Sequence, residues 1–546
     1  MAKYSIGIDF GTLSGRAVLV DTSDGREIAE AVLEYQHGVM DEFLADTDIK
    51  LPNDYALQHP RDYIDVIEYC VPEVIKASGV HNSDIIGIGI DFTSCTVIPT
   101  YCDGTPLCYS EKFNKVPDAY VKLWKDHSSL PYAEALTKLA KSEGFEFINR
   151  YGGSVSSEWL IPKIMLIADK SPEVYHDSAY FIEAADWIVW QLCGRQIRSS
   201  CTSGYKALWH HNEGFPPLEF FEKLNPCFSD LLSEKLNAPI RSIGTKAGNI
   251  TKEWACKLGL NESTAIAVGN IDGHATVPAV KVVEPGQMLM ILGTSACFMT
   301  LDEKECNVRE IAGYVKDGMM PGYYGYEAGQ ACMGDHFAWY VKNMLPYEYR
   351  LEAEKEGKSD IEYIFERSAL LKPGESGLIA LDWWNGNRAL PCVDGLSGCI
   401  IGMNLSTKPE HIFRALVEAT AYGARKITDN FRKYGLSIDS IHAAGGIAEK
   451  NPFVMQLYAD ILNMDIRISG SPQAAALGAA ITGAVAGGAY DSLTEAAENM
   501  GKLRNTVYKP SPENRAVYDA LYKEFCRLYD YFGRENDLMK NLKLYK

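Results

Sequence analysis

Residues 4–21, YSIGIDFGTLSGRAVLVD, decide the fold of this chain. Two β-rich runs, residues 4–9 and 16–21, flank a short turn that contains Gly11. A tight glycine turn between two such runs predicts a β-hairpin rather than the strand-to-helix turn of a dinucleotide-binding fold. A third strand is expected over residues 28–35, so the chain opens with strands that follow one another directly.

A second copy of this design lies far downstream. Residues 286–299, GQMLMILGTSACFM, again read as strand, Gly-Thr turn and strand. Two copies separated by half a chain indicate a duplicated architecture of two related lobes, with a cleft where ligands usually bind. The boundary is expected between Asn270 and Pro285, which gives an N-terminal lobe of residues 1–275 and a C-terminal lobe of residues 276–546.

Elsewhere in the chain, the spacing of apolar residues predicts both helices and strands. Apolar residues at helical spacing predict a helix over residues 61–78, and residues 85–92 read as the buried strand that follows it. In the second half, helices are expected over residues 411–434 and 473–486. The tail, residues 512–542, has helical spacing and is expected to be a surface helix that covers the second lobe. The pattern predicts an α/β fold.

Length and charge exclude several classes of function. A chain of 546 residues exceeds what one hydrophobic core usually organises. Its net charge of −19 repels nucleic-acid backbones and anionic membrane surfaces. The N-terminus lacks the pattern of a secretory signal and no apolar stretch is long enough to span a bilayer, so a cytoplasmic protein is expected. The fourteen cysteines lack paired zinc-ligand spacing and are expected to be reduced, small apolar residues.

The first candidate binding site is the turn within residues 9–16, DFGTLSGR. Glycines let backbone N–H groups approach phosphate oxygens, and a hydroxyl and a cation supplement them. Asp9, at the end of its strand, is the candidate for holding Mg²⁺, usually through water. An ordinary glycine hairpin is the competing interpretation, and the second Gly-Thr turn weakens it. The residues expected to grip phosphates are Gly11, Thr12, Arg16, Gly293 and Thr294.

Two further motifs lie at candidate turns. Phosphoryl transfer to an alcohol needs a carboxylate that orients the hydroxyl and accepts its proton, and Asp272 in the segment NIDGH is the candidate base. A plain Asp-Gly turn is the alternative. His274 is expected to pack or to hydrogen-bond rather than to catalyse. Gly445 and Gly446, between a strand and a helix, leave room for a flat ring or a phosphate, so they are expected to border adenosine unless they form a packing turn.

Together these motifs resemble the FGGY carbohydrate kinases, members of the actin-like, ribonuclease H-like ATPase superfamily. The resemblance covers nearly the whole chain and implies two actin-like ATPase lobes around a central catalytic cleft. It also implies ATP as co-substrate, Mg²⁺, a pentulose-binding N-terminal lobe and a nucleotide-binding C-terminal lobe. It rests on the order and spacing of Asp9-Phe10-Gly11-Thr12 with Arg16, Asp272, Gly293-Thr294-Ser295, Gly445-Gly446 and the small-residue segment 476–480.

Other segments resemble the family members that phosphorylate L-ribulose at its 5-hydroxyl, giving L-ribulose 5-phosphate. These are residues 89–96, 156–163, 204–209 and 381–388. The resemblance implies that Ser94, Lys206, Asp272 and Glu327 surround the pentulose. Position 94 carries serine where the pattern has alanine, which bears on the sugar contacts. Lys163 is expected to have a structural role, whereas for Trp383 and Trp384 core packing and a wall of the sugar site stay open.

Three alternatives stay open at this stage. A sister kinase for D-ribulose, ribitol, xylulose or glycerol would share the phosphoryl-transfer residues. An actin- or chaperone-like ATPase would hydrolyse ATP without a sugar substrate, and a non-catalytic sugar sensor would keep the fold alone. The expected partners are a pentulose and MgATP, without nucleic acid or membrane, and a homodimer is the expected assembly.

Overall fold

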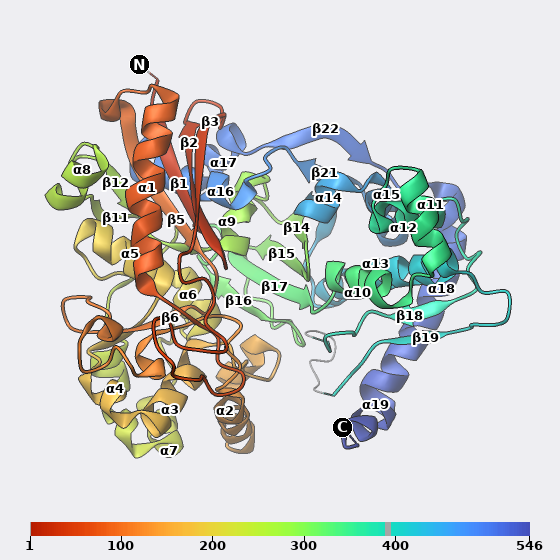
Figure 1. The fold of residues 1–546 in the computed structure, drawn as a ribbon, viewed down its shortest axis with the longest axis horizontal. Coiled ribbons are helices and arrows are strands. Elements are labelled where there is room, and N and C mark those ends of the chain that lie inside the picture. The colour runs from red at the N-terminus through yellow and green to blue at the C-terminus, as the bar shows by residue number, and fades with distance from the viewer. Residues whose placement is uncertain (1, 388–394, 546) are drawn as a thin grey trace.

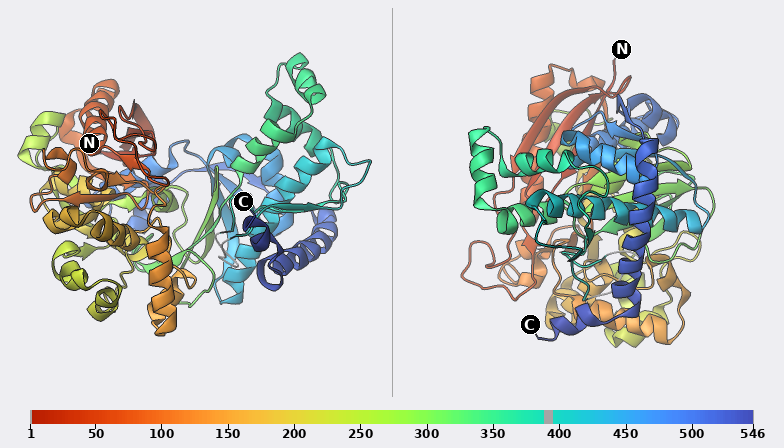
Figure 2. Two further views of the ribbon diagram at one scale, coloured as in Figure 1. Left: turned by 60° about the horizontal axis from the view of Figure 1, so that its bottom comes forward. Right: turned by 90° about the vertical axis from the view of Figure 1, so that its right-hand side faces the viewer.

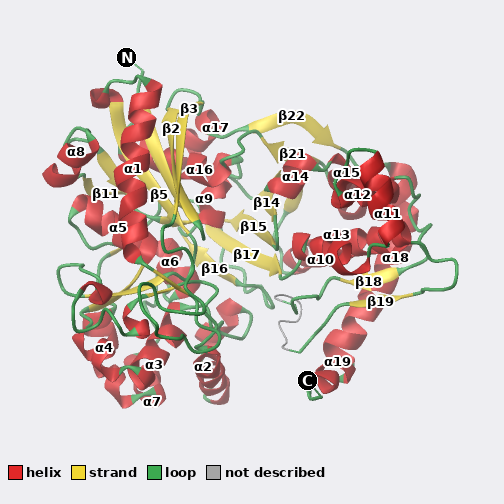
Figure 3. Ribbon diagram, in the orientation of Figure 1, coloured by secondary structure: helices red, strands yellow, loops and turns green. Residues whose placement is uncertain are grey.

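The computed structural model describes residues 2–387 and 395–545 (Figure 1). Arg388, which closes one of the segments that carry the resemblance, and Cys392 lie outside these residues. The described chain contains two seven-stranded sheets, surrounded by helices and joined to smaller sheets (Figure 3). No described helix is long and apolar enough to cross a membrane, and the described cysteines are free.

The first sheet carries the N-terminal hairpin. Its strand order is β11-β12-β5-β1-β2-β3, and β13 also pairs with β5. The predicted hairpin is confirmed, because β1 and β2 pair antiparallel across the turn at Gly11. The strands are β1 (Tyr4–Phe10), β2 (Ser14–Asp21), β3 (Glu27–Glu34), β5 (Ile85–Phe92), β11 (Lys246–Asn249), β12 (Ala265–Ala267) and β13 (Asn270–Ile271).

The second sheet repeats the order of the first over six strands. Its order is β16-β17-β15-β14-β20-β21-β22. In each sheet three antiparallel strands (β3-β2-β1 and β17-β15-β14) are followed by two parallel strands and one antiparallel edge strand, so the predicted duplication is confirmed. The strands are β14 (Gly286–Leu292), β15 (Ala296–Asp302), β16 (Gly313–Lys316), β17 (Tyr324–Gln330), β20 (Ile438–Ala444), β21 (Ile466–Ser469) and β22 (Leu503–Tyr508).

The tetrapeptide Gly-Ile-Asp-Phe occurs twice in the first sheet, at residues 7–10 and 89–92. The two copies lie side by side on β1 and β5, in parallel register with one another. Helix α16 (Ala474–Ala486) packs directly on both. A Cβ atom built on Gly7 or Gly89 would lie 1.8 Å from a backbone oxygen of α16, so this close approach requires glycine.

Two helices lie between the sheets and connect the lobes. Helix α16 and helix α9 (Asp272–Ala279) pack against each other. Their apolar side chains share one core with Val18 of the first sheet and with Leu289 and Met299 of the second. Figure 2 shows the two bodies diverging from this shared centre. Residues from both lobes therefore meet near the start of α9.

Additional helices enlarge the first lobe. They surround a four-stranded sheet of order β4-β7-β6-β8 and enclose a separate apolar core. These elements are β4 (Leu57–Gln58), β6 (Val97–Thr100), β7 (Val121–Lys122), β8 (Tyr180–Glu183), α2 (Leu130–Ser142), α3 (Leu160–Lys170), α4 (Pro172–Asp177) and α7 (Leu218–Leu224). The helices nearer the first sheet are α1 (Pro60–Ser78), α5 (Ala184–Cys193), α6 (Ser200–Lys206), α8 (Lys252–Leu258) and α17 (Leu493–Met500).

The second lobe is covered by its own helices. The predicted single helix over residues 512–542 is wrong in its extent, because α18 ends at Asp530, a π-helical turn follows over residues 531–535, and extended backbone at Asn536 comes before the next helix. Trp383 packs edge-on against Tyr529 of α18, with ring centroids 4.6 Å apart. The elements are α10 (Gly334–Met344), α11 (Tyr347–Lys355), α12 (Asp360–Ala369), α13 (Pro409–Lys433), α14 (Gly446–Lys450), α15 (Pro452–Leu462), α18 (Pro512–Asp530), α19 (Leu538–Lys543) and the strands β18 (Ile379–Leu381) and β19 (Cys399–Ile401).

Candidate active site

The candidate site residues lie where parallel strands end. Asp9 on β1 and Asp91 on β5 are register partners, and Asn270 on β13 is the next partner of Asp91. Asp272 begins α9 directly after β13. A Cβ atom on Gly273 would lie 3.0 Å from the side chain of Met299 on β15, which places the start of α9 against the second lobe. The carboxylates of the first lobe therefore face the second lobe.

Side chains of the first lobe fix the backbone of the first hairpin turn. The Gly11 N–H donates to the Ser14 carbonyl at 2.9 Å, and the Tyr35 hydroxyl donates to the Gly11 carbonyl at 2.9 Å. The Gln58 amide donates to the Thr12 carbonyl at 2.7 Å, and the indole N–H of Trp124 donates to the Thr12 hydroxyl at 3.1 Å. The turn is therefore held in place without a ligand, as a preformed phosphate site requires.

Arg16 links the hairpin to helix α16. Its Nε atom lies 3.3 Å from Asp9 Oδ2, and its Nη1 donates to Gln473 Oε1 at 2.7 Å. Gln473 is the residue immediately before α16. The sequence interpretation did not find Gln473, because the contact joins residues 457 positions apart and leaves no local pattern.

Three carboxyl groups crowd the centre of the site. Asp91 is fully buried and shares a side-chain hydrogen bond with Asp9, which requires that one of the two carboxyl groups carries a proton. Burial, followed by the charges of Asp9 and Asp272, raises the pKa of Asp91 well above its usual value. Burial also raises the pKa of Asp9, against the effect of Arg16. The pKa of Asp272 rises to about 7, chiefly through burial, although the Gly273 N–H donates to its Oδ1 at 2.6 Å and opposes the shift.

This donor set fits Mg²⁺. Mg²⁺ prefers carboxylate oxygens as ligands, and a cation beside Asp9 and Asp91 would replace the proton that these two carboxyl groups share. In the described chain, no group of three or more His, Cys, Asp or Glu side chains is arranged to hold a metal by itself. A magnesium ion here would therefore take most of its ligands from water and from ATP phosphates.

Lys206 and Glu327 form a buried ion pair beside these carboxylates. The Lys206 Nζ atom at the end of α6 lies 3.4 Å from Glu327 Oε2 on β17, and their side chains are only 9% and 13% exposed. Despite desolvation, Glu327 raises the pKa of Lys206, and Lys206 holds the pKa of Glu327 well below its usual range. Both groups stay charged. They line a cavity of about 810 Å³ together with Trp159 and Cys297, a volume that accommodates a sugar.

Lys163 holds the turn that carries Ser94 in place. Cys95 in this turn has a φ of 59°, a backbone conformation that few non-glycine residues adopt. The fully buried Lys163 ammonium donates to the carbonyl oxygens of Cys95, Lys122 and Leu123. Lys163 thus has the structural role that the sequence predicts, because it stabilises the strained turn and thereby places Ser94.

The turns of the second lobe lie at neighbouring strand ends. The Gly293 N–H donates to the Ser295 carbonyl at 2.9 Å, and the carbonyl of Thr294, an exposed residue, accepts from the Met333 N–H at 2.8 Å. Gly445 has a φ of 93°, and a Cβ atom there would lie 2.5 Å from the Leu292 carbonyl oxygen. A Cβ atom on Gly446 would meet nothing within 4 Å. Gly445 therefore allows the close packing of β14 and β20, and Gly446 borders open space.

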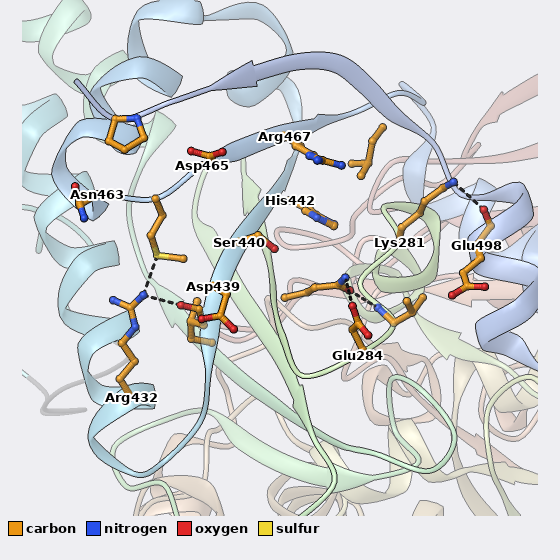
Figure 4. Close-up of a pocket in the computed structure, with 16 residues that line it drawn as sticks. Lys281, Glu284, Arg432, Asp439, Ser440, His442, Asn463, Asp465, Arg467 and Glu498 are labelled. Carbon is orange, nitrogen blue, oxygen red and sulfur yellow. Dashed lines mark hydrogen bonds between the residues drawn. The ribbon is translucent and has the colours of Figure 1, made fainter. Parts of the chain in front are cut away.

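A second cavity, of about 700 Å³, contains none of the predicted site residues. Figure 4 shows that it is lined by residues near the lobe connection, with His442 pointing into it. The His442 Nδ1 atom bonds the Val280 carbonyl at 2.6 Å. Acidic and basic side chains alternate around it, without the convergence of carboxylates and glycine turns found at the first site.

Asp91 is the principal site residue that the sequence interpretation missed. It lies within the segment 89–96 but was assigned no role. The repeated Gly-Ile-Asp-Phe is the signal that could have found it, because two identical strand segments in parallel register place identical side chains next to each other.

The two halves of the chain match the two domains of one family. The match to the N-terminal domain of the FGGY family of carbohydrate kinases spans residues 4–278, and the match to its C-terminal domain spans residues 288–487. The chain belongs to the FGGY family of carbohydrate kinases, whose members use ATP as co-substrate. The family resemblance and the predicted two-lobed α/β fold are thus confirmed.

Relatives along the full length carry a more specific name. A ribulokinase of Bacillus licheniformis is 52% identical over 538 residues, which cover 98% of each chain. A ribulokinase of Geobacillus thermodenitrificans is 50% identical, over 100% of this chain and 97% of the relative. A gluconate kinase structure from Lactobacillus acidophilus superposes with a TM-score of 0.81 at 20% identity, over 98% of this chain and 99% of that one. At that identity the structural match shows the fold alone.

Proposed function

We propose that this chain transfers the terminal phosphoryl group of ATP to the 5-hydroxyl of L-ribulose, giving L-ribulose 5-phosphate and ADP. The observation that carries the proposal is the buried Lys206–Glu327 pair at a sugar-sized cavity, close enough to Asp272 to influence its pKa. The full-length similarity to ribulokinases supports the choice of ribulose among the sugars of the family.

The proposed sugar site combines a fixed donor with a fixed acceptor. Lys206 donates to sugar hydroxyls and Glu327 accepts from them, while Ser94 offers a hydroxyl from its anchored turn. A sugar that lacks one of these hydroxyls would leave a buried charge without its partner, which is a strong basis for discrimination. The pair therefore selects for the arrangement of hydroxyls rather than for size.

Asp272 is the proposed base. Its carboxylate accepts the proton of the 5-hydroxyl as the hydroxyl oxygen bonds the γ-phosphorus and the bond from that phosphorus to the β,γ-bridging oxygen breaks. The electron pair of the broken bond leaves with ADP. Burial raises the pKa of Asp272 to about 7, which makes its carboxylate a better proton acceptor than an exposed aspartate.

The glycine turns are proposed to hold the nucleotide. The first-lobe residues Gly11, Thr12 and Arg16 and the second-lobe residues Gly293 and Thr294 would grip the phosphates, and Gly445 and Gly446 would border adenosine. Asp9, next to its register partner Asp91, is proposed to hold Mg²⁺. When bound, this ion would neutralise charge on the phosphates. Closure of the two lobes would exclude water, because an open site holding ATP would hydrolyse it.

Each lobe is proposed to bind one of the two substrates. Residues 1–275 would bind the pentulose and residues 276–546 the nucleotide. A cytoplasmic location is proposed because the phosphoryl donor ATP is held there. A homodimer is proposed because it is the commonest assembly among soluble oligomers.

A panel of acceptors tests the proposed function. ADP release is measured with L-ribulose, D-ribulose, D-xylulose, ribitol and glycerol, and without acceptor. The expected result is the highest kcat/KM with L-ribulose and slow release without acceptor. Highest activity with another acceptor would assign the chain to a sister activity, and release indifferent to every acceptor would refute a sugar kinase.

A further inference from the structure

A chain of buried contacts lies behind the Lys206–Glu327 pair. The His274 Nε2 atom on α9 lies 3.3 Å from Glu327 Oε2, and its Nδ1 atom lies 3.2 Å from the Cys201 Sγ atom. Cys201 and Lys206 both belong to α6, so one helix approaches Glu327 directly through Lys206 and indirectly through His274. Both Cys201 and His274 are buried.

The protons along this chain can be placed from the chemistry of its members. Glu327 is an ionised acceptor, because Lys206 holds its pKa well below the usual range. Burial lowers the pKa of His274, so the ring is neutral and carries one proton. Burial raises the pKa of Cys201, which therefore stays a thiol. A thiol that donates to Nδ1 leaves the ring proton on Nε2, facing Glu327.

Tyr205 fixes the plane of the imidazole. Its ring stacks on His274 with centroids 4.4 Å apart and an interplanar angle of 22°. The Tyr205 hydroxyl donates to the Gly325 carbonyl at 2.6 Å, two residues before Glu327 on β17. The imidazole and the strand that bears Glu327 are thus held to the same side chain.

The two side chains that contact Glu327 both reach the same one of its two carboxylate oxygens. Lys206 and His274 approach Oε2, and among the described residues no hydrogen bond or ion pair is found at Oε1. We propose that His274, whose ring proton is held on Nε2 by the Cys201 thiol, is a positioning residue that occupies Glu327 Oε2 beside Lys206 and thereby aims Oε1 at a pentulose hydroxyl. This inference rests on the proposed function, since it assigns Glu327 to the sugar.

The test replaces His274 in two ways. Glutamine places an amide N–H near the position of Nε2, whereas leucine fills the space without a donor. His274→Leu is expected to raise the KM for L-ribulose about 10- to 100-fold while the KM for ATP changes less than about 2-fold, which is the loss of a hydrogen bond to a charged group. His274→Gln is expected to recover most of the affinity.

A second pair of variants tests the thiol. Cys201→Ser keeps a donor for Nδ1, whereas Cys201→Ala removes it, so only the alanine variant is expected to raise the KM for L-ribulose, by about 2- to 10-fold. His442→Gln is the matched control, because this buried histidine lies in the other cavity and bonds a backbone carbonyl. Both KM values are expected to stay at the wild-type level in this control.

The outcomes separate the two proposals. If the wild-type protein does not phosphorylate L-ribulose, the proposed function is refuted. If the wild type is active and His274→Leu leaves the KM for L-ribulose unchanged, or raises the KM for ATP equally, the positioning role is refuted. Should thermal unfolding show that His274→Leu is not folded, the Cys201 pair decides, and equal KM values for its serine and alanine variants reject the inference.

Discussion

Replacing Asp272 by asparagine should separate catalysis from stability. Asparagine keeps the oxygen that accepts from the Gly273 N–H, and it has nearly the same shape. It loses the ability to accept the proton of the sugar hydroxyl. A positioned base contributes about 10²–10⁴-fold to such a step, so kcat is expected to fall by that factor while L-ribulose still binds.

The same substitution should make the free protein more stable. The pKa of Asp272 rises from an ordinary 3.8 to about 7, so the folded state holds its proton more tightly than the unfolded state. This contribution to stability is present below pH 3.8 and is lost as the pH rises to 7. Full burial would put the loss at about 4 kcal/mol, and partial solvent access at the cleft reduces it to about 1–2 kcal/mol. Asparagine mimics the protonated form and avoids the loss.

Three measurements on one preparation test these effects. A coupled assay of ADP release gives kcat, and calorimetric titration gives the affinity for L-ribulose. Thermal unfolding at pH 5 and pH 8 gives the stability difference, which should favour Asp272→Asn at pH 8 and shrink at pH 5. Near-normal turnover would remove Asp272 from the mechanism. A variant that is equally destabilised at both pH values would refute the electrostatic account.

Three other predictions follow from the same geometry. The kcat/KM for L-ribulose should fall about tenfold per pH unit below pH 7 as Asp272 gains its proton, and a flat profile between pH 5.5 and 8 would contradict this. Asp91→Asn should weaken Mg²⁺ affinity about 10- to 100-fold, seen as a smaller thermal stabilisation by ATP with Mg²⁺ than in the wild type, whereas stabilisation by ATP with a chelator stays equal. Gly445→Ala should cost about 1–3 kcal/mol of unfolding free energy, because of its positive φ and the clash with Leu292, whereas Gly446→Ala should cost little.

Local sequence patterns were sufficient to predict much of the fold. The hairpin at residues 4–21 and the helix at 61–78 follow from periodicity within one element, which depends on neighbouring residues alone. The duplicated sheet order followed from a repeated strand-turn-strand pattern. The tail was predicted less well, because its helical spacing continues through residues 531–537, where the backbone leaves the α-helix.

The site was harder to predict from the residues alone. Glycine turns can be recognised from a few neighbouring residues, whereas Lys206 and Glu327 are in contact although they lie 121 positions apart in the sequence. Taken singly, each resembles a surface charge, and only the family resemblance singled them out. His274 is buried and contacts other side chains, as expected, but its partners Cys201 and Glu327 could not be predicted, since they come from a helix and a strand that no local pattern connects.

The charges in the site indicate that Mg²⁺ is needed already for nucleotide binding, before phosphoryl transfer. Arg16 is engaged by Asp9, and Lys206 by a glutamate, so each cation has a carboxylate of its own. Asp272, whose pKa of about 7 leaves it partly ionised at neutral pH, adds negative potential near the site, and the chain as a whole carries −19. A metal-free triphosphate entering this field is repelled before any bond is made or broken. Mg²⁺ is therefore expected to arrive with the nucleotide, so that the proposed phosphate turns and Asp9 would meet the complex rather than the bare anion.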